Sequence, residues 1–414
     1  MKITEGLRKS ARNILILAGS LIFCQPLFAQ HVFTVLPRFT EGNENPVSFM
    51  RPHYAIHAAV AAGQSAPPNS AFAPSQVRHA YGFDRVANQG AGQTIGIVDA
   101  YDDPNAESDL AAFNAQFGLP VCTSNNGCFR KVYSSGKKPA TNANWAVEIA
   151  LDVEWAHAIA PKATILLIET PTNSLSDLFN GVTSAVKNGA SVVSMSWTTG
   201  EFSSETSYDN RLVSNGVTFL AASGDSGTGA AYPAASPDVI GVGGTSLFLN
   251  GDASYQSETA WSGSGGGLSK VEREPSFQSK FGIPNDPRGY RGNPDVSYDA
   301  NPGTGYAVYD SVGINGYSGW FQVGGTSAGS PQWAALIAIA NSLRVAARKA
   351  NLSSTNTILY SLAQAAPAAD FNAVTQGTNG SCGAVCTASA GYDYITGLGT
   401  PRASALIAAL VAQR

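Results

Sequence analysis

The sequence predicts an α/β protein with three layers, in which a central, mostly parallel β-sheet is covered by helices on both faces. Short apolar segments typical of buried strands alternate along the chain with longer segments that have helical spacing. The chain has 414 residues, of which 44% are hydrophobic and only 13% are charged, so one large core can be buried. Strands that are apolar on both faces need helices above and below them, as in parallel sheets.

The predicted strands are short and rich in valine, isoleucine and leucine. They cover residues 94–98, 163–168, 191–196, 217–222 and 239–243. The predicted helices cover residues 110–117, 145–159, 175–188, 332–349 and 403–412. The second helix is expected to end near Pro161, because a proline disfavours the helical conformation of the residue before it. Between residues 243 and 332 the chain is glycine-rich, and no element is predicted there.

Residues 1–29 have the pattern of a secretory signal peptide. A basic start is followed by an apolar segment, residues 14–23, and by a small residue, Ala29, after which we predict cleavage. The apolar segment is shorter than the roughly 20 residues that span a bilayer, which argues against the alternative of a membrane anchor. We therefore expect a secreted or periplasmic protein with no membrane contact after cleavage.

The rest of the chain divides into an arm and one domain. Residues 30–74 are rich in Ala, Pro, Ser and Gln and have weak periodicity, so we predict a linker or a loosely packed N-terminal arm. Residues 75–414 then form a single domain. The formal net charge is −4 and no block of Lys and Arg is present, which makes nucleic acid and anionic membranes poor candidates for partners.

Four cysteines remain once Cys24 leaves with the signal peptide. They form two close pairs in the sequence, Cys122 with Cys128 and Cys382 with Cys386. An even number of cysteines in an exported protein favours two disulfides within these pairs. Free thiols and a four-cysteine zinc site are the alternatives, but neither pair has the CxxC spacing of zinc ligands.

Ser327 is a candidate nucleophile. It follows two glycines and precedes an apolar helix, where backbone N–H groups and the helix dipole favour a developing oxyanion. Pro331 suits an early helix position, because its missing N–H costs nothing there. The alternative is that Thr326, Ser327 or Ser330 only caps the helix.

Glu148 and Asp152 are a candidate acid–base pair. Four residues apart, they share one face of the predicted helix 145–159, with side chains about 5–6 Å apart. The helix is apolar on most sides and is expected to be buried, so two like charges there are costly and one pKa should rise. An exposed helix could carry such a pair without function, whereas a buried pair suits proton transfer.

Asp225 follows the predicted strand 217–222 and is expected at the carboxyl end of the sheet, where ligand sites of parallel sheets gather. A carboxyl group kept neutral can donate a hydrogen bond to an oxyanion. The alternative is an Asx-turn in the Ser-Gly-Asp-Ser-Gly loop. Gly265 and Gly266, in a run of glycines, and Ser196, at a strand end, are candidates for substrate binding.

Six segments together resemble the sedolisins, the serine-carboxyl peptidases, which share the subtilisin fold. They are FAPSQVRHAYG (72–82), WAVEIALD (145–152), SGDSG (223–227), WSGSGGGLS (261–269), NPDVS (293–297) and GGTS (324–327). The resemblance implies a peptidase that acts on polypeptides in acid. It implies that Ser327 is the nucleophile, that Glu148 is the general base and acid, oriented by Asp152, and that protonated Asp225 stabilises the oxyanion.

The sequence departs from this family in two places. The family usually has a long N-terminal propeptide, whereas residues 30–74 are too short for one, so control by a propeptide is not expected. The family also has a C-terminal calcium site, whose first carboxylate would fall at Ala373. Asp393 survives as a remnant of that site, and Asn372 could supply one neutral oxygen. We therefore expect no required cofactor and no metal, with calcium as the alternative.

Other functions remain possible alternatives. A subtilisin-type Ser-His-Asp peptidase would need a histidine partner, and His157 near a helix end is the candidate. Asp99 resembles the position of the acidic member of that triad, but we expect a structural or supporting role for it here. A secreted binding module on the same fold, without activity, is a second alternative. A dinucleotide-binding enzyme is disfavoured, because no glycine follows the first strand. We expect a monomer.

Overall fold

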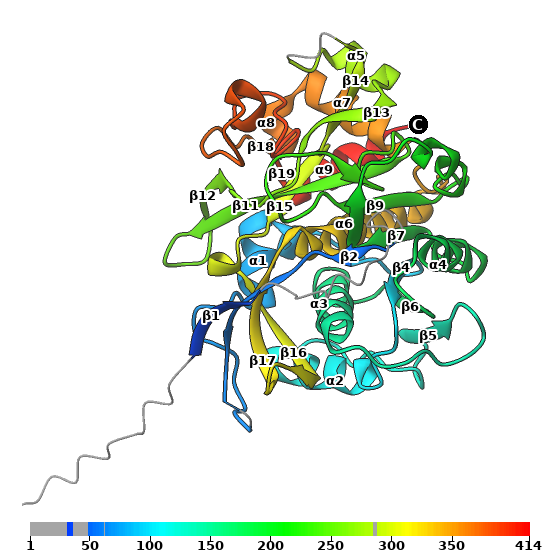
Figure 1. The fold of residues 1–414 in the computed structure, drawn as a ribbon, viewed down its shortest axis with the longest axis vertical. Coiled ribbons are helices and arrows are strands. Elements are labelled where there is room, and N and C mark those ends of the chain that lie inside the picture. The colour runs from blue at the N-terminus through cyan, green and yellow to red at the C-terminus, as the bar shows by residue number, and fades with distance from the viewer. Residues whose placement is uncertain (1–30, 36–48, 62, 285–287) are drawn as a thin grey trace, which may run out of the picture.

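The computed structural model describes residues 31–35, 49–61, 63–284 and 288–414. Its central sheet has the strand order β12-β11-β9-β7-β4-β6-β5, with β15 also paired to β11 (Figure 1). All of these pairings are parallel except that of the edge strand β12 (Tyr255–Ala260). The parallel strands are β4 (Thr94–Ala100), β5 (Phe129–Tyr133), β6 (Thr164–Thr170), β7 (Val192–Met195), β9 (Thr218–Ala222), β11 (Val239–Leu249) and β15 (Val296–Asp299). The predicted fold class is confirmed.

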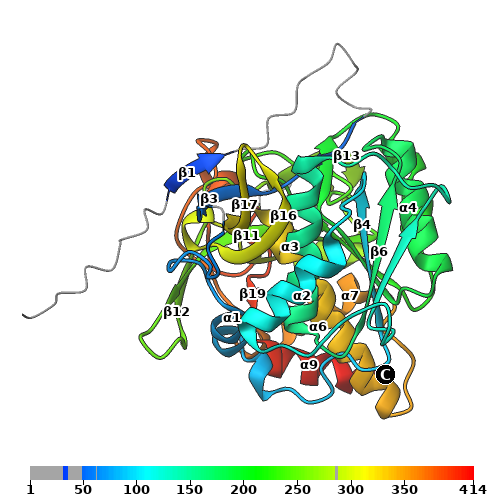
Figure 2. The ribbon, with the colours of Figure 1, turned by 90° about the horizontal axis from the view of Figure 1, so that it is seen from below.

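Two hydrophobic cores lie on the two faces of this sheet. Ile95 and Ile97 of β4 pack into the core that contains helices α3 (Ala143–Ile159) and α6 (Thr326–Ala346). The alternate residues Val98 and Ala100 pack into the other core, with α4 (Leu175–Lys187). Figure 2 shows α3 and α6 on one side of β4 and β6, and α4 on the other. Side chains of a strand alternate between faces, so a strand that is buried on both must be apolar throughout.

The observed helices follow the predicted ones closely, with one exception. Helix α2 (Ala106–Phe117) begins a few residues early, α3 and α4 differ by no more than two residues at each end, and α9 (Ala403–Ala412) has the predicted bounds. The exception is α6, which begins at Thr326. The prediction that Pro331 stands in the first turn is therefore wrong, because five helical residues precede it. The missing N–H leaves the Ser327 carbonyl without its helical partner, and the Ser196 hydroxyl lies 3.4 Å from that carbonyl.

The glycine-rich stretch contains a hairpin that was not predicted. Strands β16 (Tyr306–Ile314) and β17 (Tyr317–Gly324) are antiparallel, and β17 leads directly into α6. Asn315 and Gly316 form the turn, with φ of 53° and 84°. An Asn-Gly pair at positive φ is the strongest short signal for a two-residue hairpin, so this element could have been found from the sequence.

The prediction of a loosely packed arm is wrong for residues 49–60. Strand β2 (Arg51–Pro52) pairs with β8 (Trp197–Gly200), and β3 (Ala55–Ala59) pairs with β17. Met50, Tyr54 and Ile56 are buried. Strand β1 (His31–Val35) pairs with β3. The predicted signal peptide, its cleavage site and residues 36–48 lie outside the described residues.

The remaining elements surround these layers. They are α1 (Pro74–Tyr81), α5 (Ser276–Phe281), α7 (Thr355–Ala365), α8 (Pro367–Asp370), β10 (Ala231–Tyr232), β13 (Gly267–Arg273), β14 (Tyr290–Asn293), β18 (Phe371–Asn372) and β19 (Thr400–Pro401). Both predicted disulfides are present, Cys122–Cys128 and Cys382–Cys386. Among the described residues, no helix combines the length and the apolar character needed to cross a bilayer.

Candidate active site

Helix α3 carries Glu148 and Asp152 into the core. It begins after Asn142, whose side-chain oxygen accepts hydrogen bonds from the backbone N–H groups of Asn144 and Trp145. Both carboxyl groups are fully buried, as is all of α3 from Trp145 onward. Burial favours a neutral carboxyl group and raises the pKa of both; for Glu148, repulsion from Asp152 adds to the effect. The pair is therefore suited to holding and passing protons.

Asp99, at the end of β4, is a third buried carboxyl group beside this pair. Burial, followed by the charge of Asp152, raises its pKa. Neither Asp99 oxygen has a hydrogen-bond partner within the described part of the chain. Asp152 accepts a hydrogen bond of 2.9 Å from the Ser196 hydroxyl. Ser196, predicted to bind substrate, thus directs its side chain at Asp152 and orients that carboxyl group.

Ser327 is the second residue of α6. Its hydroxyl donates to the backbone carbonyl of Ser196 over 3.2 Å and accepts from the backbone N–H of His53 over 3.1 Å. The hydroxyl is near enough to Glu148 to lower the pKa of that carboxyl group, against the larger and opposite effect of burial. A full hydrogen bond is not formed, since both Glu148 oxygens lack a well-placed partner among the described residues.

Asp225 lies on the other side of the α6 N-terminus. Its Oδ1 accepts hydrogen bonds of 2.8 Å from both the backbone N–H and the hydroxyl of Thr326. Its Oδ2 is buried and has no partner in the described ranges. Burial raises the pKa of Asp225 to about 6, so this carboxyl group carries a proton in acid and can donate it from Oδ2.

A cleft of about 320 Å³ opens next to Asp225. Its walls include Thr198 and Gly200 of β8, the loop 223–231 and Gly265. Gly265 packs against the Ser223 carbonyl and Gly266 against the Tyr394 carbonyl so closely that a side chain at either position would clash. Of the three residues predicted to bind substrate, Gly265 lines the cleft, Gly266 is its neighbour, and Ser196 is buried behind it.

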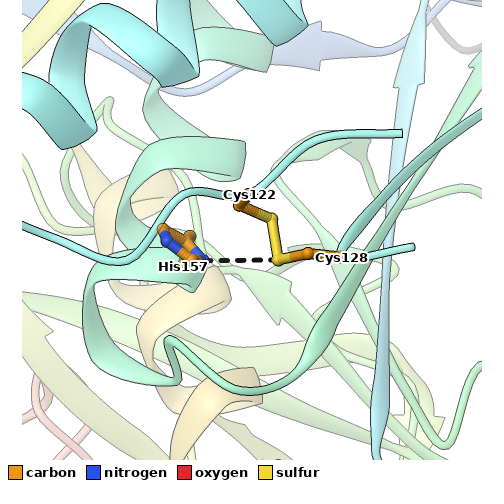
Figure 3. Close-up of side chains that lie close together, drawn as sticks. All are labelled: Cys122, Cys128 and His157. Atoms are coloured by element: carbon orange, nitrogen blue, oxygen red, sulfur yellow. Dashed lines mark hydrogen bonds between the residues drawn. A yellow bond between two sulfur atoms is a disulfide. The ribbon is translucent and has the colours of Figure 1, made fainter. Parts of the chain in front are cut away.

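His157 does not have the position of a catalytic histidine. Its Nε2 lies 3.0 Å from the Pro120 carbonyl and its Nδ1 lies 4.0 Å from Sγ of Cys128, beside the Cys122–Cys128 disulfide (Figure 3). Burial lowers the pKa of His157 to about 4. The ring is used to hold the disulfide loop against the end of α3, which disfavours the subtilisin-type triad.

His53 is a neighbour of Ser327 that the sequence did not reveal. Its backbone contacts Ser327, while its ring Nε2 lies 2.5 Å from the Thr198 hydroxyl. Burial and the nearby Arg51 lower the pKa of His53 to about 4. The ring is thus occupied by Thr198 and is not directed at the Ser327 hydroxyl. The short segment around His53 has no periodic pattern, and its contact with Ser327 joins residues that are far apart in the sequence. The sequence alone therefore could not indicate His53.

At the C-terminal position expected for calcium, the Asp393 side chain accepts hydrogen bonds from its own loop. Oδ1 of Asp393 accepts hydrogen bonds from the backbone N–H groups of Ile395 and Thr396. Its Oδ2 accepts from the Thr396 hydroxyl and, over 3.3 Å, from the Ser389 backbone. This carboxyl group is used to hold its own loop, and Ala373 offers no side-chain oxygen.

Within the part of the chain that the structure describes, two other groups of side chains have atoms that can ligate a metal. The first, Cys122, Cys128 and His157, is already used in the disulfide loop. The second is a buried carboxyl cluster of Asp103, Asp109 and Asp310. Glu154 is its neighbour, because repulsion from all three adds to the effect of burial in raising the pKa of Glu154.

Comparisons with known proteins agree with this fold. A family model described as the subtilase family matches residues 140–413. Kumamolisin from Bacillus sp. (strain MN-32) is 32% identical over 400 residues, which cover 87% of this chain and 68% of that protein. Sedolisin from Pseudomonas sp. (strain 101) is 28% identical over 347 residues, which cover 75% of this chain and 56% of that protein.

A solved structure of Pseudomonas sedolisin, described as a serine-carboxyl proteinase with two molecules of pseudo-iodotyrostatin, superposes with a TM-score of 0.71 at 25% identity. The superposition covers 82% of this chain and 97% of the sedolisin chain. A lanthipeptide protease, at 13% identity and a TM-score of 0.52, shares the fold. The chain therefore belongs to the subtilase family, within the group of serine-carboxyl peptidases that kumamolisin and sedolisin represent. It spans 68% of the length of kumamolisin and 56% of that of sedolisin.

Proposed function

We propose that this chain is a secreted, monomeric peptidase that hydrolyses polypeptides in acid through an acyl-enzyme on Ser327. Two observations carry the proposal: the Ser327 hydroxyl lies close enough to the buried Glu148 to affect its pKa, and Asp225, which binds the neighbouring Thr326, has an Oδ2 without a partner among the described residues. A nucleophile, a proton acceptor and an oxyanion donor thereby meet at one helix N-terminus.

In this mechanism Glu148 takes the proton of the Ser327 hydroxyl as the oxygen attacks the substrate carbonyl carbon. Asp152, held by Ser196, keeps Glu148 in place and shares its charge. The backbone N–H of Ser327 and the protonated Oδ2 of Asp225 donate hydrogen bonds to the oxyanion. Glu148 then gives its proton to the leaving amine, and a water molecule hydrolyses the ester by the same route.

The test is digestion of a peptide library across pH 2–8 by the purified protein. Turnover in acid that vanishes in the Ser327→Ala protein supports the proposal. A folded protein that binds peptides across this range but cleaves none would instead favour the binding module. The library also reports the preferred side chains and whether cleavage occurs inside chains or near their ends.

Replacement of Asp225 should separate the effect of its protonation on activity from the effect of its position. In Asp225→Asn, the amide oxygen can keep both Thr326 contacts while the amide nitrogen donates at any pH. We expect partial activity that no longer falls as pH rises through about 6. Asp225→Ala should lose about 10²–10³ in kcat, as when one oxyanion donor is removed. An alkaline limb of the pH–rate profile that is the same in Asp225→Asn and wild type would contradict this role.

We further propose that folding and activity do not require calcium. Calcium needs six to eight oxygen ligands, and the loop around Asp393 has its carboxylate already engaged. The melting temperature at pH 4 should be nearly equal in millimolar calcium and in excess chelator. As a control, Asp393→Asn should lower the melting temperature equally under both conditions. A drop of many degrees in chelator that calcium alone reverses would refute this proposal.

A further inference from the structure

Four buried acidic side chains come together where the loop between β4 and α2 packs with α2, α3 and β16. They are Asp103, Asp109, Glu154 and Asp310, far apart in the sequence and marked by no motif. Figure 2 shows α2 against α3, with β16 alongside. One carboxyl oxygen from each of the three aspartates lies within 4.8 Å of the others. Calcium binds oxygens at about 2.3–2.6 Å, so oxygens this close to one another can share one ion.

Asp109 and Asp310 are held in place by hydrogen bonds that leave lone pairs for a cation. Both oxygens of Asp109 accept from Ser311, one from its backbone N–H and one from its hydroxyl. The two oxygens of Asp310 accept from the backbone N–H groups of Val312 and Gly313. A carboxylate has about four lone-pair sites on its two oxygens, so each oxygen can also bind a cation. Hydrogen bonds of this kind commonly orient the carboxylates that bind metals.

The other two acids each have one oxygen without a partner in the described part of the chain. Glu154 is fully buried; its Oε2 accepts from the backbone N–H of Tyr309, next to Asp310, and its Oε1 is partnerless. Burial raises the pKa of Glu154, and repulsion from all three aspartates adds to this, so its carboxyl group faces them. Asp103 accepts from the backbone N–H of Asn105 through Oδ1, while its buried Oδ2 is partnerless. A buried oxygen without a donor needs a proton or a cation.

The positive charge of Lys131 is not enough to balance this cluster. Its Nζ donates to the backbone carbonyl of Asp103, and its charge lowers the pKa of that carboxyl group against the larger, opposite effect of burial. The same ammonium group forms ion pairs with Asp102 and Glu169 over 3.0 and 2.8 Å. One shared ammonium cannot neutralise four buried carboxylates, and uncompensated buried charges are strongly destabilising. A divalent cation among the four groups would supply the missing charge.

We propose that Asp103, Asp109, Glu154 and Asp310 bind a calcium ion at neutral pH, at a site separate from the C-terminal loop around Asp393. Carboxylate oxygens favour calcium, magnesium or manganese over softer metals. Ligands from four separate segments suit the flexible geometry of calcium better than the strict octahedron of magnesium. The four carboxylates supply about four of its six to eight oxygens, and water completes the shell. The ion joins α3, which carries the proposed acid–base pair, to the hairpin that leads into α6.

This site is compatible with folding and activity that do not require calcium in acid. Carboxyl groups bind the ion only when they are deprotonated, so protons compete with calcium and its affinity falls as pH falls. The melting temperature at pH 4 should therefore stay independent of calcium, whereas binding to the cluster is measured at neutral pH. The inference does not depend on the role of Ser327.

The experiment measures calcium binding to the full chain at pH 7.5, by calorimetric titration after removal of metal with a chelator. We expect one ion per chain, with a dissociation constant on the order of 10⁻⁵ M or lower because several carboxylates contribute charge. The melting temperature at this pH should be several degrees higher in millimolar calcium than in chelator, since a ligand that binds the folded state stabilises it. Magnesium at the same concentration should raise the melting temperature less.

Glu154→Gln and Asp103→Asn test the location of the ion. Each change removes the negative charge while the remaining oxygen can still accept its backbone hydrogen bond. Each should weaken calcium binding by about tenfold or more, and the double variant should abolish it. Without calcium at pH 7.5, both variants should melt at or above the wild-type temperature, because repulsion within the cluster is relieved. A carboxylate that served only the fold would give the opposite shift.

Glu205→Gln is the matched control. Glu205 is also fully buried, its Oε2 accepts from the backbone N–H of Phe202 over 2.7 Å, and its Oε1 is partnerless among the described residues. Within those residues, however, it belongs to no group with the spacing of metal ligands. Glu205→Gln should therefore bind calcium with wild-type affinity.

Calcium binding of equal affinity in the wild type and in the double variant would overturn the location. Absence of calcium binding by the wild type at pH 7.5 would overturn the site and leave protons as the occupants of the cluster. Tighter binding of magnesium than of calcium would overturn the choice of ion. None of these results bears on the proposed peptidase activity, which is measured separately in acid.

Discussion

A Ser327→Ala protein should lose peptidase activity by a factor on the order of 10⁴ or more while it remains folded. The change removes only the hydroxyl group, whose oxygen must bond to the substrate carbon. Its two hydrogen bonds, with the His53 N–H and the Ser196 carbonyl, are each worth about 1 kcal/mol, so the fold should survive. Activity on a flexible peptide at pH 4 and the melting temperature are the two measurements.

Ser330→Ala is the matched control for this change. Ser330 is on the same helix, is equally buried, and its hydroxyl contacts the Ser194 hydroxyl at 2.8 Å. We expect near-native turnover from this variant and a similar, small loss of stability. Turnover by a folded Ser327→Ala protein close to that of wild type would remove Ser327 from the mechanism.

Activity should peak in acid, at roughly pH 3–5, around the reference pKa values of carboxyl groups. Asp225 must keep its proton in order to donate it, so activity should fall as pH rises through about 6. The Glu148–Asp152 pair must be able to accept a proton, so activity should also fall in strong acid. Burial raises the pKa of both carboxyl groups, which moves the acidic limb of the pH–rate profile, and with it the optimum, toward higher pH.

Glu148→Gln tests the base directly. The amide is similar in shape but cannot accept the serine proton, so we expect a loss of about 10²–10⁴ in kcat at the optimum. His157→Ala should leave the shape of the pH–rate profile unchanged, because its ring serves the disulfide loop. An optimum above neutral pH, lost in His157→Ala but kept in Glu148→Gln, would return the subtilisin-type triad to first place.

The sequence could predict those parts of the site that depend on local spacing. Glu148 and Asp152 share a helix face because they are four residues apart, and Asp225 lies at a strand end because the strand before it is apolar. The start of α6 at Thr326 could not be read in the same way. Glycine and proline both weaken helix signals, and α6 follows Gly325 and contains Pro331.

Contacts between segments that are far apart in the chain could not be predicted from the sequence. The position of His53 at Ser327 joins residues 274 positions apart, and nothing in the composition of residues 30–74 indicates it. The third carboxyl group, Asp99, was expected only in a supporting role, since its approach to Asp152 depends on how α3 lies across β4. In each case packing, rather than local preference, decides the outcome.

The carboxyl cluster of Asp103, Asp109, Asp310 and Glu154 makes the stability of the fold depend on pH. Burial raises the pKa of Asp103 and of Asp310 to about 7, far above the value of about 4 of an unfolded chain. Folding therefore takes up protons, and the stability that these groups contribute is complete below about pH 4 and is lost as pH rises through about 7. Bound protons therefore stabilise the fold at a cluster that lies outside the proposed catalytic residues. On transfer from acid to neutral pH in the absence of calcium, these carboxyl groups would ionise and the free energy of unfolding would fall. The protein would then stay folded, and able to act, for a shorter time.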